Sequence, residues 1–169
     1  MARVITLSRQ FLKGHPKAGQ PTYFVERALA SMGPPMSDKI KPFVDLLIYH
    51  GILQKGGEKK HTIRFGRRWK DGDMASLRAW SGKPYRSKQV KIAPDVKLRV
   101  VDIVVDYKIG FIYKEFNESG FKTLDPNILA LNDGLTFEDF VDWFEFKKHK
   151  GKNIAKEAQI LIWGDVKEY

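Results

Sequence analysis

Residues 57–64 gather side chains that can perform nucleophilic chemistry. Lys59 and Thr62 stand three positions apart in the run Gly57-Glu58-Lys59-Lys60-His61-Thr62-Ile63-Arg64. A threonine hydroxyl is a weak nucleophile and needs an adjacent base. A lysine amine can be that base where burial or neighbouring cations lower its pKa to roughly 7–8. Four further cations in or just after this segment can supply such a field: Lys60, Arg64, Arg67 and Arg68.

Asp133 is the acid that this chemistry would use. It lies just before Thr136-Phe137-Glu138-Asp139, which resembles a helix-capping box with Asp in the Glu position. The positive end of the helix dipole favours an ionised carboxylate there, which can orient an ammonium group or hold a ligand amine. Taken singly, each residue also has an ordinary role as a solvated lysine, a strand threonine or a turn aspartate. Only their conjunction indicates a site.

Strand geometry sets a condition on this site. Thr62 and Arg64 share one face of a strand, whereas Lys59 falls on the opposite parity. For Lys59 to join Thr62, the chain must turn at Lys59-Lys60, and the upstream pair Gly56-Gly57 permits such a turn. Arg64 has an alternative role, since it can simply pair with an acid such as Asp73.

The positive charge of the chain is concentrated in one fifth of its length. The 169 residues carry a net charge of +10, and Lys59–Lys91 holds eleven basic and two acidic residues. Interleaved aromatic and basic side chains are typical of nucleic-acid grooves, where cations contact phosphates and rings stack on bases. The alternative is a solvated face, or a basic module that binds an acidic protein. The predicted nucleic-acid-binding residues are Lys60, Arg64, Arg67, Arg68, Trp69, Trp80, Tyr85, Arg86 and Lys88.

Apolar periodicity predicts a small α+β protein. Helices are expected after Thr22 and Ser37 and over Phe137–Phe144, where apolar residues recur at helical spacing. Residues 107–132 read as loops with short helical turns. Strands are expected over Arg3–Ser8, Lys60–Phe65, Ala75–Trp80, Gln89–Ala93, Leu98–Val105 and Ala158–Trp163. This order favours a mixed β-barrel with flanking helices, in which the first, second, fifth and last of these strands share one sheet.

Several classes of protein are excluded by composition. The chain has no cysteine, so disulfides, thiol catalysis and cysteine-based metal sites are ruled out. Its four histidines show no metal-like pairing, and its glycines form no phosphate loop, so we expect neither metal nor cofactor. No apolar run is long enough to span a membrane, and the start lacks a secretion signal. A cytoplasmic protein is therefore expected.

The run at 57–64 matches the pattern G-x-K-x-x-T-x-R and resembles the signature of the ASCH domain family. Similarity extends to both ends of the chain, through Val4–Leu7, Trp69–Asp73, Asp133–Thr136 and Ile160–Trp163. The family belongs to the PUA-like superfamily of small β-barrels linked to RNA. The resemblance therefore implies a single PUA-like domain over residues 1–169, with a helical insertion at about 12–54 after the first strand.

The resemblance also implies a function. Members of the family are thought to bind RNA, which favours recognition of RNA or of a modified nucleobase or nucleoside in a basic cleft. Some small bacterial members are amidohydrolases that act on N4-acetylcytidine, and their catalytic Lys, Thr and Glu correspond to Lys59, Thr62 and Asp133. The Asp is one methylene shorter than the family's Glu. Deacylation of cytidine is thus the alternative function, and a basic protein-interaction module is the third.

Overall fold

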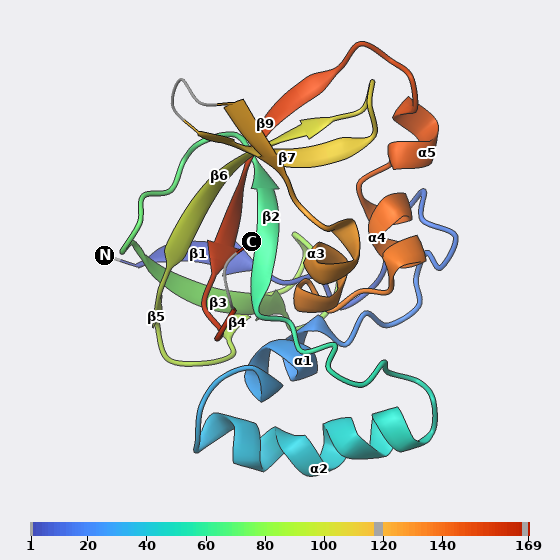
Figure 1. The fold of residues 1–169 in the computed structure, drawn as a ribbon. Helices are drawn as coiled ribbons and strands as arrows, with labels where there is room; N and C mark the ends of the chain where they lie inside the picture. Colours follow the sequence, from blue (N-terminus) through green and yellow to red (C-terminus); the bar gives the residue numbers. More distant parts are fainter. Residues whose placement is uncertain (1, 117–119, 167–168) are drawn as a thin grey trace.

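The large sheet of the protein has five strands and carries the run at 57–64. The structure, a computed structural model, describes residues 2–116, 120–166 and 169. The strands are ordered β2 (His61–Phe65), β9 (Ala155–Ile162), β6 (Arg99–Asp106), β7 (Phe111–Phe116) and β8 (Gly120–Thr123). Each is antiparallel to its neighbours (Figure 1). This sheet positions Thr62 opposite Leu161 of β9.

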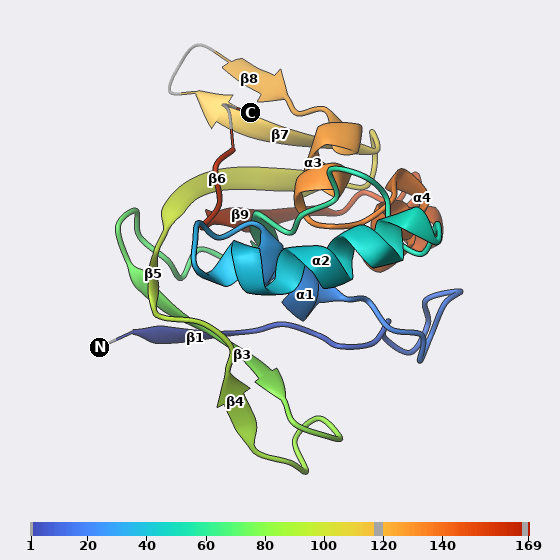
Figure 2. The same ribbon diagram turned by 90° about the horizontal axis from the view of Figure 1, so that it is seen from below.

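The second sheet is built around β3 (Met74–Trp80). Strand β1 (Arg3–Thr6) runs parallel to it, while β4 (Gln89–Lys91) and β5 (Val96–Lys97) pair with it in antiparallel fashion. Figure 2 shows the two sheets as separate layers. The helices α1 (Phe24–Ala30) and α2 (Met36–Tyr49) cross in front of the sheets in this view. The loop at 81–88, which carries much of the positive charge, connects β3 to β4.

Five helices complete the described part of the chain: α1 (Phe24–Ala30), α2 (Met36–Tyr49), α3 (Pro126–Asn132), α4 (Phe137–Trp143) and α5 (Phe146–His149). The predicted cap of α4 is present, since the Thr136 hydroxyl accepts from the Asp139 amide at 3.1 Å. Asp125 caps α3 in the same way, and α3 ends at Asp133. None of the described helices has the length and apolar character needed to cross a membrane.

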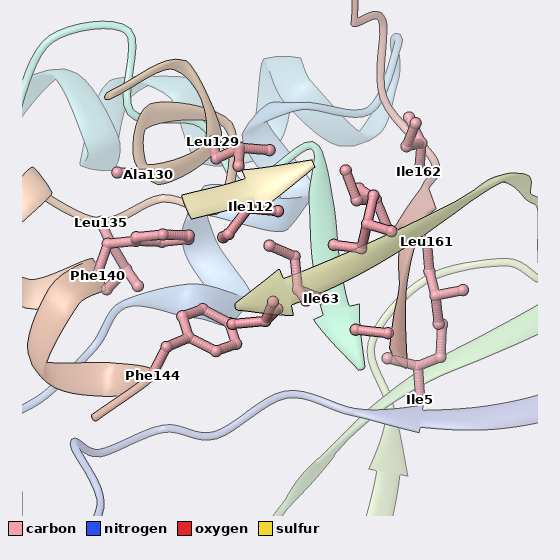
Figure 3. Packing of buried hydrophobic residues seen from close by; sticks show 14 of the residues in the cluster. Ile5, Ile63, Ile112, Leu129, Ala130, Leu135, Phe140, Phe144, Leu161 and Ile162 are labelled. Atoms are coloured by element: carbon pink, nitrogen blue, oxygen red, sulfur yellow. The ribbon is translucent and has the colours of Figure 1, made fainter. Parts of the chain in front are cut away.

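The main core lies between the two sheets and the helices α1, α3 and α4. Ile5 of β1 faces Leu161 of β9, while Phe140 and Phe144 close the opposite side (Figure 3). A smaller cluster of Val44, Leu47 and Leu53 joins α2 to α1. Because α2 belongs to this second cluster, it forms a layer outside the main core.

The α+β class is confirmed, whereas the expected closed barrel is not seen among the described residues. Their pairings form two sheets, and β1 pairs with β3 rather than with β2, β6 or β9. The prediction that all four of these strands share one sheet was therefore wrong for β1. A parallel partner far along the chain leaves no local trace in sequence, unlike the hairpin-like antiparallel neighbours.

The largest local error concerns residues 107–132, where β7 and β8 form in place of the expected loops. The short helix α3 agrees with the helical turns expected in the same segment. In β6, Ile103, Val104 and Val105 are all buried, so both faces of this strand are covered, and its pairing with β9 runs without interruption from Arg99 to Asp106.

Buried Gln159 of β9 attaches the basic segment after β2 to the large sheet. Its Oε1 accepts from the amides of Arg68 and Trp69, each at 2.9 Å. Its Nε2 donates to the Trp69 carbonyl at 2.9 Å and to Asp102 at 2.8 Å. Three of these four hydrogen bonds hold residues 68–69 in place, and the fourth joins Gln159 to β6.

Replacing Gln159 with Leu should lower the free energy of unfolding by about 1–3 kcal/mol, because two backbone amides and a carboxylate lose their partner. Hydrogen exchange of the Arg68 and Trp69 amides should become faster. Gln20→Leu, at an exposed position, is the control. Equal stability of both variants in urea denaturation would contradict this role of Gln159.

Candidate functional site

Lys59 and Asp133 meet in the interior of the protein. Lys59 is 2% exposed, and its Nζ donates to the Asp133 carboxylate as well as to the Asp133 carbonyl, the latter at 2.9 Å. The ammonium also lies 4.0 Å from the centre of the Phe24 ring, a cation–π contact. Two residues 74 positions apart thus form a buried ion pair, as the resemblance implied for a common site.

The segment just before β2 positions Lys59 in this pair. The Lys60 amide donates to the Asn132 carbonyl at 2.8 Å, and its carbonyl accepts from the amides of Trp163 and Gly164. The Lys59 amide donates to the Arg27 carbonyl at 3.1 Å. The turn expected at Lys59-Lys60 is not found there: the turn lies at Lys55-Gly56, and Lys59 precedes β2, with its ammonium at the end of α3.

Two glycines make room for this arrangement. A Cβ on Gly57 would lie 2.7 Å from Nη1 of Arg27, closer than real contacts allow. Gly134 has a φ of +73°, and a Cβ there would lie 3.0 Å from the Arg27 Cδ and 3.2 Å from the Lys59 Cβ. Close packing thus requires a glycine both at position 57, shortly before Lys59, and at position 134, directly after Asp133.

The surroundings of the pair hold more positive than negative charge. Burial lowers the pKa of Lys59, and the nearby Arg64 and Arg27 lower it further, whereas Asp133 raises it. Burial raises the pKa of Asp133, while Lys59 and Arg64 oppose this. Desolvation therefore favours a neutral pair, whereas the attraction between the two groups favours the ion pair.

Arg64 lies beside the pair and joins it to the small sheet. Its Nη2 donates to the Thr6 carbonyl at 2.7 Å, and Gln89 of β4 donates to the Thr6 hydroxyl at 3.0 Å. Burial lowers the pKa of Arg64, whereas Asp133 raises it, although the residue as a whole is exposed. Asp73 pairs instead with Arg3 at 3.4 Å, so the alternative Arg64–Asp73 pair is not formed.

Thr62 is buried on the same face of β2 as Arg64. In the described part of the chain its hydroxyl makes no hydrogen bond with Lys59 or Asp133, or with any other group. The structure thus brings two of the three predicted catalytic residues, Lys59 and Asp133, into contact. The third, Thr62, lies three residues after Lys59, on β2. A hydroxyl without a partner is free to bond a ligand or water.

Sequence reasoning missed that the segment 12–54 contributes to this site. Phe24 and Arg27 of α1 contact Lys59 directly, and the Ser31 hydroxyl donates to the Lys59 carbonyl at 2.9 Å. These residues looked like the apolar stripe and surface charge of an ordinary helix. A helix position shows which face is buried but not what it is buried against.

A basic hollow of about 650 Å³ lies between the chain after β1 and the loop at 81–88. Trp80 and Lys83 contribute from the loop side, and Arg9 and Lys13 contribute from the other side. Phe11 lines it as well, and none of the lining residues is acidic. Arg9 and Lys13 were not predicted as binding residues, because they lie far in sequence from the basic segment Lys59–Lys91.

The other predicted nucleic-acid-binding residues fall into two groups. Tyr85 is 90% exposed, with its ring 5.2 Å from Trp80, and Arg86 and Lys88 are exposed in the same loop. Arg67 and Arg68 are exposed at the other end of β3, where Arg67 pairs with Glu157 at 3.5 Å. The basic window is therefore two patches separated by the length of β3, roughly 20 Å.

Three residues within the basic segment Lys59–Lys91 have structural roles. Trp69 packs on the main core, and the Arg3 guanidinium lies 4.5 Å from its ring centre. His61 is fully buried beside the Tyr169 hydroxyl, so it cannot stack on a base. Lys60 is half-buried, and its side chain packs where a Cβ on Gly164 would lie.

The described residues contain no group of histidines and acids that could hold a metal ion. Comparisons with protein-family models, with curated proteins and with solved structures found no match to this chain.

Gly134→Ala should destabilise the protein more than Gly110→Ala. Both glycines have a φ near +74°, but nothing lies within 4 Å of a Cβ at Gly110. Gly110→Ala should cost about 1 kcal/mol for the left-handed backbone. Gly134→Ala should cost about 1–3 kcal/mol more, because Arg27 and Lys59 must move. Urea denaturation measures the difference, and equal losses would contradict the packing role of Gly134.

Asp133→Asn should cost about 3–5 kcal/mol at pH 7, because it leaves the Lys59 ammonium buried without an anion. The folded-state pKa of Lys59 then lies still further below its unfolded value, so the unfolded chain binds more protons. Stability of the variant relative to the parent should therefore rise as pH increases from 7 toward about 10. Asp165→Asn, at an exposed acid, should show neither effect. A pH-independent deficit in urea denaturation would contradict this.

Proposed function

We propose that this chain is a cytosolic ASCH-type, PUA-like domain that recognises RNA or a modified nucleobase. The observation that carries the proposal is the acid-free basic hollow of Arg9, Lys13, Lys83 and Trp80. A binding site of one charge sign attracts phosphates, and a tryptophan at its wall offers a stacking surface for a base.

The exposed loop beside the hollow extends this surface. Tyr85 has a φ of +61°, a backbone conformation that is uncommon for a tyrosine, and its ring is almost wholly exposed next to Trp80. A large aromatic side chain in solvent gains nothing for folding, so a binding role accounts for its position best. Arg86 and Lys88 place two more cations in the same loop.

The hollow is connected to the buried ion pair through the small sheet. Ser8 lines the hollow, and two residues earlier Thr6 contacts both Arg64 and Gln89. Arg64 in turn interacts electrostatically with Lys59 and Asp133.

Tyr85→Ala should weaken binding of a single-stranded RNA oligonucleotide by about 5- to 100-fold, the loss of one stacked base. The matched control is Tyr49→Ala on α2, because Tyr49 is 84% exposed and far from the hollow in sequence and fold. Fluorescence anisotropy at several salt concentrations measures both variants. Affinity of the parent should fall with salt by a slope of about 0.7 per neutralised phosphate.

Tyr85→Ala should leave that slope unchanged, since it removes no charge. Equal effects of the two tyrosine variants, or binding that salt does not alter, would contradict the nucleic-acid proposal. If RNA does not bind at all, the surface is better explained as a basic module for an acidic protein.

The second candidate function is deacylation of N4-acetylcytidine, favoured by the buried Lys59–Asp133 pair and by a Thr62 hydroxyl that has no hydrogen-bond partner among the described residues. Thr62 would attack the acetyl carbonyl and pass its proton to neutral Lys59. The cytidine amine would leave with a proton, and water would then release acetate from Thr62. Arg64 supplies a positive group near the position where negative charge develops.

Thr62→Ala should abolish release of cytidine from N4-acetylcytidine while leaving the melting temperature within a few degrees. Asp133→Glu should preserve or raise activity, because it restores the reach of the family's Glu. Thr123→Ala, on an exposed strand, is the control. Chromatography of the products measures all three, and a parent protein that releases no cytidine would remove this candidate without affecting the binding proposal.

A further inference from the structure

A second hollow, of about 470 Å³, borders the segment that follows Asp133, because Gly134 and Leu135 line it. It is formed by the loop before α1, the segment after α2 and the start of α4. Its polar lining consists mainly of Lys17, Gln20, Arg27, Gln54, Thr136 and Asp139. None of the functions discussed above uses it.

Arg27 is the unusual member of this lining. Its side chain is 8% exposed, and Nη1 donates to the Gly57 carbonyl at 2.9 Å. Its Nε–H is buried and has no hydrogen-bond partner among the described residues. Buried donors in proteins are almost always paired, so an unpaired one marks a place where an acceptor is missing.

Among the described residues, Arg27 also lacks a compensating carboxylate. Asp139 is already compensated, since its carboxylate lies 2.7 Å from Nζ of Lys17 and 3.8 Å from Nε2 of His15. No carboxylate of the described chain lies within ion-pair distance of Arg27. Burial lowers the pKa of Arg27 to about 10, with Asp139 and Glu58 acting against this only at a distance. Lys17, Arg27 and Asp139 together leave the hollow with one excess positive charge.

The Arg27 guanidinium is also held in a fixed position. Gly57 and Gly134 lie on two sides of it, and a Cβ on either glycine would crowd its atoms. A donor fixed in this way loses little freedom when a ligand binds, which favours affinity.

We propose that this hollow binds a small molecule through a carboxylate or phosphate group that pairs with the Arg27 guanidinium. Lys17, which is paired with Asp139, keeps that acid from cancelling the charge of Arg27, and Gln20, Gln54 and Thr136 offer neutral polar contacts for the rest of the ligand. The volume is that of a site for a small metabolite. This hollow adjoins the basic hollow, since Phe11 and Pro21 line both, but the proposal stands whether or not RNA binds.

The site also adjoins the buried ion pair. The Arg27 carbonyl accepts from the Lys59 amide, and Gly134 follows Asp133 directly. An anion beside Arg27 would offset part of the positive field that acts on Lys59. Occupancy of the hollow is therefore expected to be sensed at the candidate catalytic pair.

The test is a nuclear magnetic resonance titration that follows arginine Nε–H signals. Inorganic phosphate and acetate are added separately, with sodium chloride at equal ionic strength as the reference. Arg27→Lys removes one signal and so assigns it. We expect this signal to shift saturably with phosphate, acetate or both, which tells the two ligand chemistries apart. No saturable shift with either anion would overturn the proposal.

Two variants keep the test independent of any damage to Arg27. Lys17→Ala, at a side chain that is 45% exposed, removes the excess charge and should weaken anion binding about fivefold. Gln54→Trp, at an exposed position, should obstruct the hollow and abolish the shift. Lys39→Ala, on the outer face of α2, is the control of equal charge and should bind as the parent does. Equal behaviour of Lys17→Ala and Lys39→Ala would contradict the site.

Discussion

The Lys59 ammonium and the Asp133 carboxylate lie in the interior, where each charge persists only if the other meets it. Much of the local architecture serves that contact. Strand β2 begins just after Lys60, α3 ends at Asp133, and Gly57 and Gly134 let Arg27 pass between them. A change at any of these points would leave a buried charge without its partner.

An arginine lies on each side of this ion pair. Arg64 on one side connects the pair to Thr6 and so to the basic hollow, while Arg27 on the other side borders the second hollow. Both arginines lower the pKa of Lys59. The two arginines that flank this pair thus belong to different parts of the molecule, one to the large sheet and one to α1.

The sequence predicted those features that local patterns encode. Helix caps and strand alternation located α4, β2, β6 and β9, although β7 and β8 were taken for loops. The meeting of Lys59 with Asp133 followed from a family resemblance and not from spacing. The roles of Phe24, Arg27 and Arg9 could not be predicted, because each depends on which distant segment packs against it. The parallel pairing of β1 with β3 has the same cause.

The central claim is that RNA lies along the hollow beside the loop at 81–88. Photo-cross-linking tests it most directly, with a short single-stranded RNA that contains 4-thiouridine and with mass spectrometry of the linked peptides. The account predicts cross-links to residues 8–13 and 80–88, on both walls of the hollow. Cross-links confined to α2 or to the β7–β8 hairpin, or their absence at low salt, would contradict it.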